Sequence, residues 1–322
     1  MPPKNRWKGN PRELLRWSEG SSLAELDHRA TPGWSGKKRH GREFMAYRGE
    51  LLSELQERLY AHGRSGGNSS VLLVVQGMDT SGKGGIARHV MSMVDPQGVT
   101  LRSFGRPTEE EHKHHYLWRV RRALPAGGQI GLFDRSHYED VLVARVEGLV
   151  EPEVWQQRYE EINRFEQKIA DAGTTIIKVA LMISYSEQGQ RLMRRLHRRD
   201  KHWKFDPSDV DARKQWEAYR DAYTDVFERT STEVAPWHVI PADRKWYGRL
   251  AVTELLTHAL IDLDLSWPKP RWKVETQKRR LARTMDDKTL AKAAQSRSDT
   301  KKKVRKQEQE FAAAVAKASN HT

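Results

Sequence analysis

The chain has 322 residues, of which 37% are hydrophobic, which is enough for one large α/β domain with appendages. It contains no cysteine, so a disulfide framework, a thiolate metal site and a cysteine nucleophile are all excluded. No stretch resembles a transmembrane span, and Met1 to Trp7 lack the apolar core of a signal peptide. We therefore expect a cytoplasmic protein with no membrane partner.

The formal net charge of +14 is unevenly distributed along the chain. Sixteen Lys or Arg and six Asp or Glu residues lie from Lys269 to Thr322, so this stretch carries ten of the fourteen net charges. A basic protein usually meets a polyanion. Here, however, most of the excess charge lies in a C-terminal tail, and the rest of the chain carries an ordinary charge.

The N-terminal part of the chain is expected to form an arm followed by a helix. Residues 1–40 are polar and contain the turn cluster Thr31 to Gly36, which indicates an extended, partly ordered arm. From Arg42 to Ala61, apolar residues recur every three or four positions. This spacing predicts an amphipathic helix that ends near Gly63.

The most informative stretch begins at Val71 to Val75, a short, largely β-branched run that predicts a strand buried on both faces of a parallel sheet. A glycine-rich turn follows, and then a segment with helical spacing. This order predicts a P-loop built on Gly77, Gly82 and Lys83. Its backbone N–H groups would surround an anion, and the Lys83 ammonium would bind the outer phosphates.

We expect the whole loop to contact phosphate. Its residues are Gly77, Met78, Asp79, Thr80, Ser81, Gly82, Lys83, Gly84 and Gly85. Two of them are unusual. Gly84 occupies the position of the Ser or Thr that binds magnesium in ordinary P-loop NTPases. Asp79 would place a negative charge directly beside bound phosphate unless a metal ion lay between them.

Val99 to Phe104 is predicted to be a second strand, and Thr108 with Glu111 forms a capping box for a helix that runs to about Ala123. This helix carries His112, His114 and His115. Adjacent histidines point to different faces, and no second ligand cluster is evident in the sequence. We therefore favour a polar lining or surface role over a zinc site.

The stretch from Gln129 to Arg135 is an apolar strand that ends in a carboxylate, which is the Walker B arrangement. Asp134 would lie at the carboxyl end of a strand beside the P-loop, where it could hold Mg²⁺ directly or through water. Arg135 would face the same crevice. The P-loop about fifty residues earlier makes this interpretation specific.

A helix from Glu153 to Ala170 and a strand from Thr174 to Leu181 are predicted next. An arginine-rich helical stretch follows, in which several side chains share one face: Arg191, Arg194, Arg195, Arg198 and Arg199. Charge runs are usually solvated. We nevertheless favour a mobile lid over about 186–215 that brings arginines to phosphates, because P-loop kinases carry a lid at this place in the chain.

Pro236 to Asp243 is predicted to be the last strand and its exit loop, followed by a helix from about Lys245 to Leu263. The predicted fold is therefore α/β, with a parallel sheet of about five strands flanked by helices and joined by right-handed crossovers. We place the kinase domain at 41–265 and a basic, partly helical or disordered tail at 266–322. The run from Lys301 to Lys306 has no interleaved aromatic residue, which argues against single-stranded nucleic-acid binding.

Three motifs together resemble the polyphosphate kinase 2 family. They are the loop Gly77 to Gly84, the stretch Asp134 to Leu142, and the run Thr230 to Asp243. The resemblance extends from about Asp27 to Leu263. A glycine after the P-loop lysine, here Gly84, and an aspartate inside the loop, here Asp79, are both typical of this family. The resemblance implies a three-layer P-loop kinase fold related to thymidylate kinase.

The resemblance also implies an activity, namely Mg²⁺-dependent, reversible phosphoryl transfer between inorganic polyphosphate and nucleoside mono- or diphosphates, so that AMP and ADP become ADP and ATP. The acceptors would be adenine nucleotides, with guanine nucleotides as an alternative that the sequence does not separate, and the protein would be a homodimer or homotetramer. Residues carried over by the resemblance are Lys83 for the transferring phosphoryl group, Asp79 and Asp134 for magnesium, and Arg135, Arg191, Arg194 and Arg198 for the polyanion.

Two alternatives stay open at this point. An ATP-dependent nucleotide or small-metabolite kinase would have the same fold, because the P-loop serves many phosphoryl transfers. A nucleic-acid-binding ATPase would use the basic tail, and deletion of 270–322 would then abolish its function. The kinase interpretation predicts that such a deletion leaves the chemistry intact.

Overall fold

The computed structural model describes residues 2–295, 305–310 and 313. The strands are β1 (Ser70–Gln76), β2 (Val99–Ser103), β3 (Ile130–Asp134), β4 (Thr174–Met182) and β5 (Trp237–Pro241). The helices are α1 (Pro11–Leu15), α2 (Lys38–Arg64), α3 (Lys83–His89), α4 (Glu109–His112), α5 (Leu117–Arg121), α6 (Glu139–Val146), α7 (Pro152–Asp171), α8 (Tyr185–Leu196), α9 (Ser208–Lys214), α10 (Trp216–Thr230), α11 (Lys245–Asp262), α12 (Val274–Ala282) and α13 (Asp287–Gln295). Short 3₁₀ turns are η1 (Met91–Met93), η2 (Pro96–Gly98) and η3 (Arg199–Lys204).

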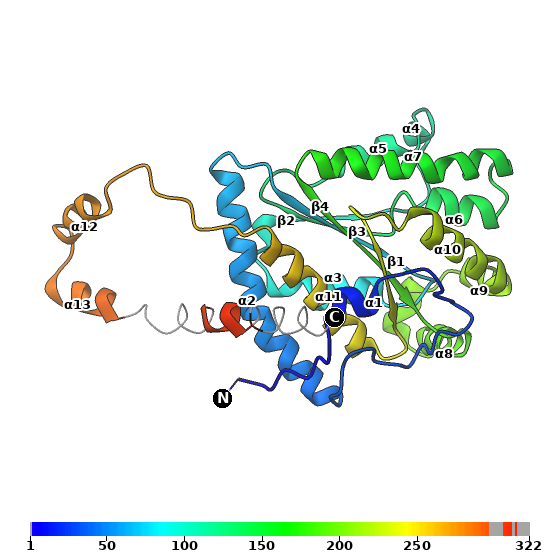
Figure 1. The fold of residues 1–322 in the computed structure, drawn as a ribbon, viewed down its shortest axis with the longest axis horizontal. Coiled ribbons are helices and arrows are strands. Elements are labelled where there is room, and N and C mark those ends of the chain that lie inside the picture. Colours follow the sequence, from blue (N-terminus) through cyan, green and yellow to red (C-terminus); the bar gives the residue numbers. More distant parts are fainter. Residues whose placement is uncertain (1, 296–304, 311–312, 314–322) are drawn as a thin grey trace.

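The strands form one parallel sheet in the order β2-β3-β1-β4-β5 (Figure 1). β1 lies at the centre, and every one of its residues is buried. This is the environment that its continuous apolar sequence predicts. The predicted parallel α/β sheet of five strands is confirmed.

Helices cover both faces of the sheet, so the domain has three layers (Figure 1). Alternate side chains of a strand point to opposite faces. In β1, Val71, Leu73 and Val75 pack with α2 and α11, whereas Leu72 and Val74 pack on the opposite side with α7 and α10. The two apolar clusters account for the stability of the layers and fix the positions of the loops at the strand ends.

The predicted helix over 108–123 is wrong as a continuous helix, because the structure has two short helices, α4 and α5, separated by a turn. The Thr108–Glu111 capping box is present, as the sequence predicts. The turn includes a local bond in which His115 Nδ1 accepts the backbone N–H of Leu117 at 3.3 Å. Side-chain bonds of this kind compete with helical bonds and favour a break.

The segment before α2 packs along the domain. The Trp17 backbone N–H donates to the Trp237 carbonyl oxygen at 2.8 Å, next to an antiparallel bridge between Arg16 and His238. The side chains of Leu15, Trp17 and Trp34 are buried. This segment therefore covers β5, which would otherwise be an open edge of the sheet.

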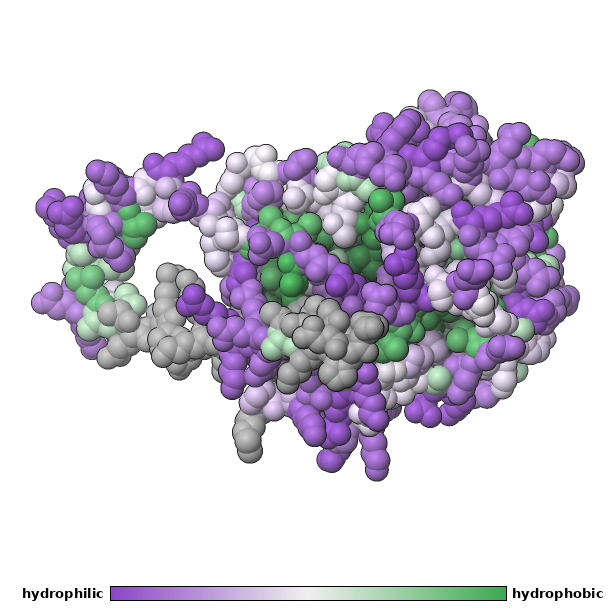
Figure 2. Space-filling model, in the orientation of Figure 1, coloured by the Kyte–Doolittle hydropathy of each residue, from purple (hydrophilic) through white to green (hydrophobic). Residues whose placement is uncertain are grey.

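Beyond α11 the chain leaves the domain, and α12 and α13 stand away from it before residues 305–310 return alongside α2 (Figure 1). Gln307 donates to the Tyr47 carbonyl oxygen at 3.1 Å, and Arg58 pairs with Glu308 at 2.6 Å. Figure 2 shows small apolar patches among hydrophilic side chains on the protruding helices.

Only part of the predicted tail is described by the structure. Residues 296–304, 311–312 and 314–322, and with them the lysines at 301–303, lie outside the described residues. No helix in the described part of the chain is long and apolar enough to cross a membrane.

Candidate functional site

A cleft of about 1830 Å³ opens at the carboxyl ends of the strands, which is where open α/β sheets bind ligands. The loop from Gly77 to Gly85 forms its floor. One wall comes from the end of β3 and from α4, and the other from α8, η3 and α9. The sheet topology thus brings together the predicted P-loop, the strand that ends in Asp134 and the arginine-rich segment.

The loop between β1 and α3 has the backbone of a P-loop. Gly77 has φ +144°, and a Cβ there would lie 2.6 Å from the Leu181 carbonyl oxygen, so no larger residue fits. Gly82 has φ +123° and directly precedes α3. Thr80 also has a positive φ, +65°, which is uncommon for a residue with a branched Cβ and indicates that its surroundings hold it there.

Lys83, the first residue of α3, turns back over the loop. Its Nζ donates to the Gly77 carbonyl oxygen at 2.5 Å and to the Met78 carbonyl oxygen at 3.3 Å. Burial lowers the pKa of Lys83, and the nearby Arg135 cation lowers it further. Since these two carbonyls are its hydrogen-bond partners among the described residues, the ammonium keeps a third donor for an anion.

Asp79 and Arg135 meet across the cleft floor, where an Arg135 N–H donates to Asp79 Oδ1 at 2.8 Å. Burial alone would raise the pKa of Asp79, but Lys83 and Arg135 outweigh it and hold that pKa below its ordinary value. Asp79 is therefore an ionised carboxylate at neutral pH. Arg135 adopts φ +64° directly after β3, so the chain reverses sharply at this point.

Asp134 ends β3 and lines the same cleft. A Cβ added at Gly84 would lie 4.0 Å from Asp134 Oδ2, so this carboxylate borders the spot where an ordinary P-loop carries its magnesium-binding hydroxyl. No group of three or more His, Cys, Asp or Glu residues suited to a metal occurs among the described residues. Two carboxylates fit Mg²⁺, which usually takes one or two carboxylates and completes its shell with water and phosphate oxygens.

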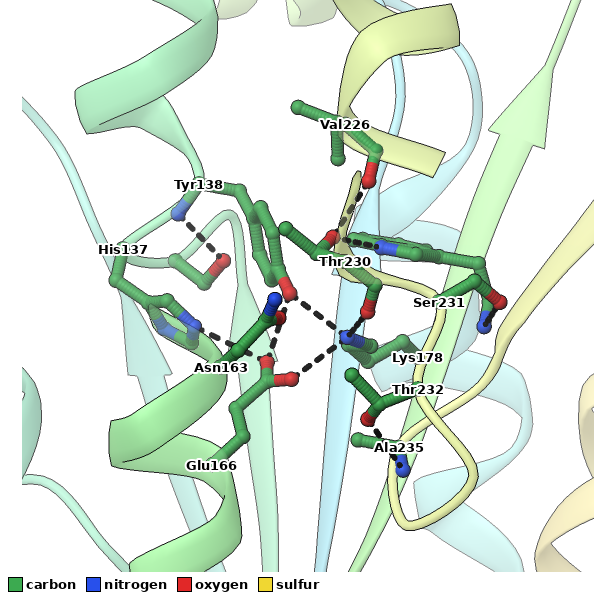
Figure 3. Close-up of polar contacts among 12 residues, drawn as sticks. His137, Tyr138, Asn163, Glu166, Lys178, Val226, Thr230, Ser231, Thr232 and Ala235 are labelled. Atoms are coloured by element: carbon green, nitrogen blue, oxygen red, sulfur yellow. Dashed lines mark hydrogen bonds and ion pairs between the residues drawn. The ribbon is translucent and has the colours of Figure 1, made fainter. Parts of the chain in front are cut away.

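A buried polar network supports the loop that follows Arg135 (Figure 3). Lys178 on β4 donates to Glu166 at 2.6 Å, to the Tyr138 hydroxyl at 2.8 Å and to the Thr230 carbonyl oxygen at 2.7 Å. Tyr138 donates to Glu166 at 2.8 Å, and His137 lies 3.2 Å from the same carboxylate. Burial would raise the pKa of Glu166, but the Lys178 and His137 contacts hold it below its ordinary value. The network ties β4, α7 and the end of α10 to the Asp134–Tyr138 turn.

The arginines of the predicted lid differ in their surroundings. The Arg194 side chain is 56% exposed, pairs with Glu187 and lines the cleft. Arg198 also lines the cleft and pairs with Asp200 at 2.8 Å. Arg191 also borders the cleft, but its side chain is only 3% exposed and its guanidinium is bonded to protein groups.

Sequence reasoning missed further cations beside the P-loop. The cleft is also lined by Arg88 on α3 and by Lys245 and Arg249 on α11. Burial lowers the pKa of Arg249 most, and the cations of Arg42 on α2 and of Arg88 lower it further. No ion pair is recorded for these residues within the described part of the chain. Their helical positions beside a P-loop could have drawn attention to them, but nothing in the sequence shows that they gather.

Asp209 on α9 was also missed. Burial and the adjacent Asp79 raise its pKa to about 6, and Arg195 opposes this with a contact of 3.3 Å. The predicted lid therefore contributes a carboxyl group that meets the P-loop carboxylate. On the opposite wall, His112 and His114 line the cleft, whereas His115 lies 3.4 Å from Glu161.

Comparison with known proteins gives one family. The family described as Polyphosphate kinase 2 (PPK2) matches residues 35–266. The chain is 45% identical over 248 residues to an AMP/ADP-polyphosphate phosphotransferase of Meiothermus ruber, which covers 77% of this chain and 91% of that protein. It is 38% identical over 244 residues to an ADP-polyphosphate phosphotransferase of Rhodopseudomonas palustris, and this match covers 72% of this chain and 83% of that protein. The crystal structure of Polyphosphate Kinase 2 from Arthrobacter aurescens TC1 superposes with a TM-score of 0.85 at 46% identity, covering 87% of this chain and 99% of that one.

Proposed function

The chain belongs to the polyphosphate kinase 2 family, and from this premise we propose that it transfers phosphoryl groups between inorganic polyphosphate and nucleoside mono- or diphosphates. One observation carries the proposal beyond its relatives' names. The P-loop is surrounded by cations that lack carboxylate partners in the described residues, among them Arg88, Lys245 and Arg249. Two polyanions must meet in this reaction, and uncompensated cations lower the cost of bringing them together.

The cation cluster indicates where the donor lies. Burial lowers the pKa of Arg249 most, and the Arg42 and Arg88 cations lower it further; the pKa of His89 is lowered by burial and then by Arg249, Arg88 and Arg42. Such mutual repulsion is relieved by a bound polyanion. We place the polyphosphate chain along α3 and the start of α11, with its end at the P-loop.

An in-line transfer requires the acceptor to approach from the opposite side. That side of the cleft is bounded by Arg106, His114 and Tyr116 near α4 and by Trp203 on the lid. The acceptor nucleotide would lie there. Because its attacking group is an already ionised phosphate oxygen, the reaction needs no strong general base.

The residues of this chain would act mainly by charge and position. Lys83 would exchange its contacts with the Gly77 and Met78 carbonyl oxygens for the transferring phosphoryl group. Arg135 would share its guanidinium between Asp79 and phosphate, and Arg194 and Arg198 would approach from the lid. A magnesium ion held by Asp79 and Asp134, directly or through water, would neutralise charge on the phosphate oxygens.

The test is an assay that varies donor and acceptor separately. AMP and ADP are each offered with long-chain polyphosphate and a divalent cation, AMP is also offered with ATP, and the nucleotides are separated by chromatography. We expect polyphosphate to support ADP formation from AMP, ATP formation from ADP, or both. Faster use of ATP than of polyphosphate with AMP would instead favour an ATP-dependent kinase. Membership of the family also implies a homodimer or homotetramer, which light scattering would test.

A further inference from the structure

Arg191 on α8 uses every N–H of its guanidinium group in bonds to the protein. Nε donates to Glu187 at 2.8 Å, and one terminal nitrogen donates to the carbonyl oxygens of Thr80 at 2.9 Å and Ser81 at 2.8 Å. The other terminal nitrogen donates to the carbonyl oxygens of Ala242 at 2.7 Å and Asp243 at 3.0 Å. A guanidinium has five N–H donors, so none is left for a phosphate oxygen.

The two P-loop carbonyls are the ones that decide the shape of the anion site. In a trans peptide the C=O and N–H point in opposite directions. Holding the Ser81 carbonyl toward Arg191 therefore points the Gly82 N–H away from that guanidinium. Arg191 also fixes the Thr80 carbonyl, at a residue whose φ of +65° is otherwise unfavourable, and the Ser81 N–H on the far side of that peptide donates to the Met78 carbonyl oxygen at 3.0 Å.

The other bonds of Arg191 connect the loop to a rigid frame. Ala242 and Asp243 lie directly after β5. The Asp243 carboxylate accepts hydrogen bonds from the backbone N–H and the hydroxyl of Ser184, each at 2.9 Å, and Ser184 is the N-cap residue of α8. The base of α8, the β5 exit and the P-loop are thus joined through one side chain. Arg194, one turn later, has no such role, because its side chain is 56% exposed and its recorded partner is Glu187.

We propose that Arg191 is a positioning residue, which holds the P-loop backbone in its anion-binding shape and does not contact phosphate. This inference rests on the proposed function, since it assigns a role within the same site. It also separates two kinds of arginine on α8, one that builds the loop and others that face the cleft.

The decisive variant is Arg191→Lys. Lysine keeps the positive charge and so preserves the long-range field, but its single ammonium cannot reach four carbonyl oxygens and Glu187 at once. If Arg191 shapes the loop, kcat falls by about 10-fold to 100-fold, because small misplacements of phosphate-binding groups cost rate in this range. Pyrophosphate affinity, measured by calorimetry without turnover, falls by about 10-fold. The dependence of polyphosphate affinity on salt concentration stays unchanged, because no charge that contacts phosphate is lost.

Arg194→Ala is the matched comparison from the same helix. It removes a cation that faces the cleft, so it should weaken the salt dependence of polyphosphate binding. Arg191→Gln, which retains donors for two of the carbonyls, serves if the lysine variant does not fold, with the same expected losses in kcat and pyrophosphate affinity. Circular dichroism and thermal melting establish that each variant is assayed while folded.

Two results would overturn the proposal. One is an Arg191→Lys protein with kcat and pyrophosphate affinity within about twofold of the wild type, since a point charge would then suffice. The other is a salt dependence reduced in Arg191→Gln as much as in Arg194→Ala, which indicates a lost phosphate contact. A wild-type protein that binds pyrophosphate but does not use polyphosphate would contradict the proposed function alone, and the pyrophosphate affinities of the variants would still test Arg191.

Discussion

Lys245 is a cleft residue whose charge changes within the ordinary pH range. Burial lowers its pKa to about 8, with the Arg191 and Arg194 cations adding to the effect. It lines the cleft at the start of α11, beside the proposed path of polyphosphate. A polyanion binds the protonated form better, so its affinity is full below pH 8 and falls as the pH rises through that value.

We therefore predict that polyphosphate affinity, measured as a function of pH, declines with a midpoint near pH 8 in the wild-type protein. Lys245→Arg should remove this decline, because an arginine stays protonated throughout the range. The measurement is a binding titration at fixed ionic strength between about pH 7 and 9.5. An identical decline in Lys245→Arg would show that another group is responsible.

At the level of single residues, the sequence predicts the cleft floor well. Asp79, Lys83, Asp134 and Arg135 lie together because each is fixed to the end of a buried strand or the start of a helix, and such positions follow from local patterns. The role of Arg191 could not be read in the same way. Its partners are backbone carbonyls from two distant loops, and the identity of a residue says nothing about the peptide groups that will surround it.

The buried network of Figure 3 joins β4, α7 and α10, so its loss should lower the stability of these elements as a unit. We predict that Lys178→Met lowers the free energy of unfolding by about 3–5 kcal/mol, because it leaves the Glu166 carboxylate buried without its cation. The double variant Lys178→Met/Glu166→Gln should lose at least about 1 kcal/mol less than the single one. Denaturant unfolding of the four proteins in the cycle measures this coupling. Additive losses would mean that the pair does not act as a unit.

Contact between the lid and the P-loop should depend on pH through Asp209. Its pKa is about 6 in the folded protein and 3.8 in the unfolded chain, because burial and Asp79 disfavour the charged form. Folding therefore retains its full stability below about pH 4, and part of it is lost as the pH rises through 6.

Asp209→Asn cannot ionise, so we predict that it is more stable than the wild type at pH 7.5 by about 1–2 kcal/mol and equal to it near pH 4. Denaturant unfolding at the two pH values, with a chelator present to exclude divalent cations, is the measurement. An equal gain at both pH values would contradict the pairing of Asp209 with Asp79.

Across the whole molecule, the net positive charge is divided unevenly between the basic tail and the rest of the chain. The tail after Pro268 carries most of the net positive charge, and none of its described residues lines the cleft. We predict that deletion of 270–322 leaves kcat unchanged and weakens affinity for long polyphosphate at low salt only, because exposed charges are screened at high salt. Steady-state kinetics with long and short polyphosphate at two ionic strengths test this. A loss of kcat on deletion would give the tail a part in catalysis.

The fold was predictable because its signals are local and repeated. β1 and the strand that ends in Asp134 are short apolar runs of the kind that parallel sheets bury on both faces, and the parallel order follows from the alternation of strands and helices. The break between α4 and α5 was not predictable, since it depends on a histidine side chain that bonds the backbone of Leu117. The return of residues 305–310 to α2 rests on polar contacts of Gln307 and Glu308, which leave no periodic pattern.

The most direct experiment compares wild-type protein with Lys83→Ala in a reaction containing ADP, long-chain polyphosphate and magnesium, with ATP followed by chromatography. Lys83 lies over the loop at which the proposed transfer takes place. We predict ATP formation by the wild type and a loss of at least about 100-fold in the variant, with an unchanged circular dichroism spectrum. Equal rates in the two proteins would contradict transfer at this P-loop, and so would the absence of product from both ADP and AMP in the wild type.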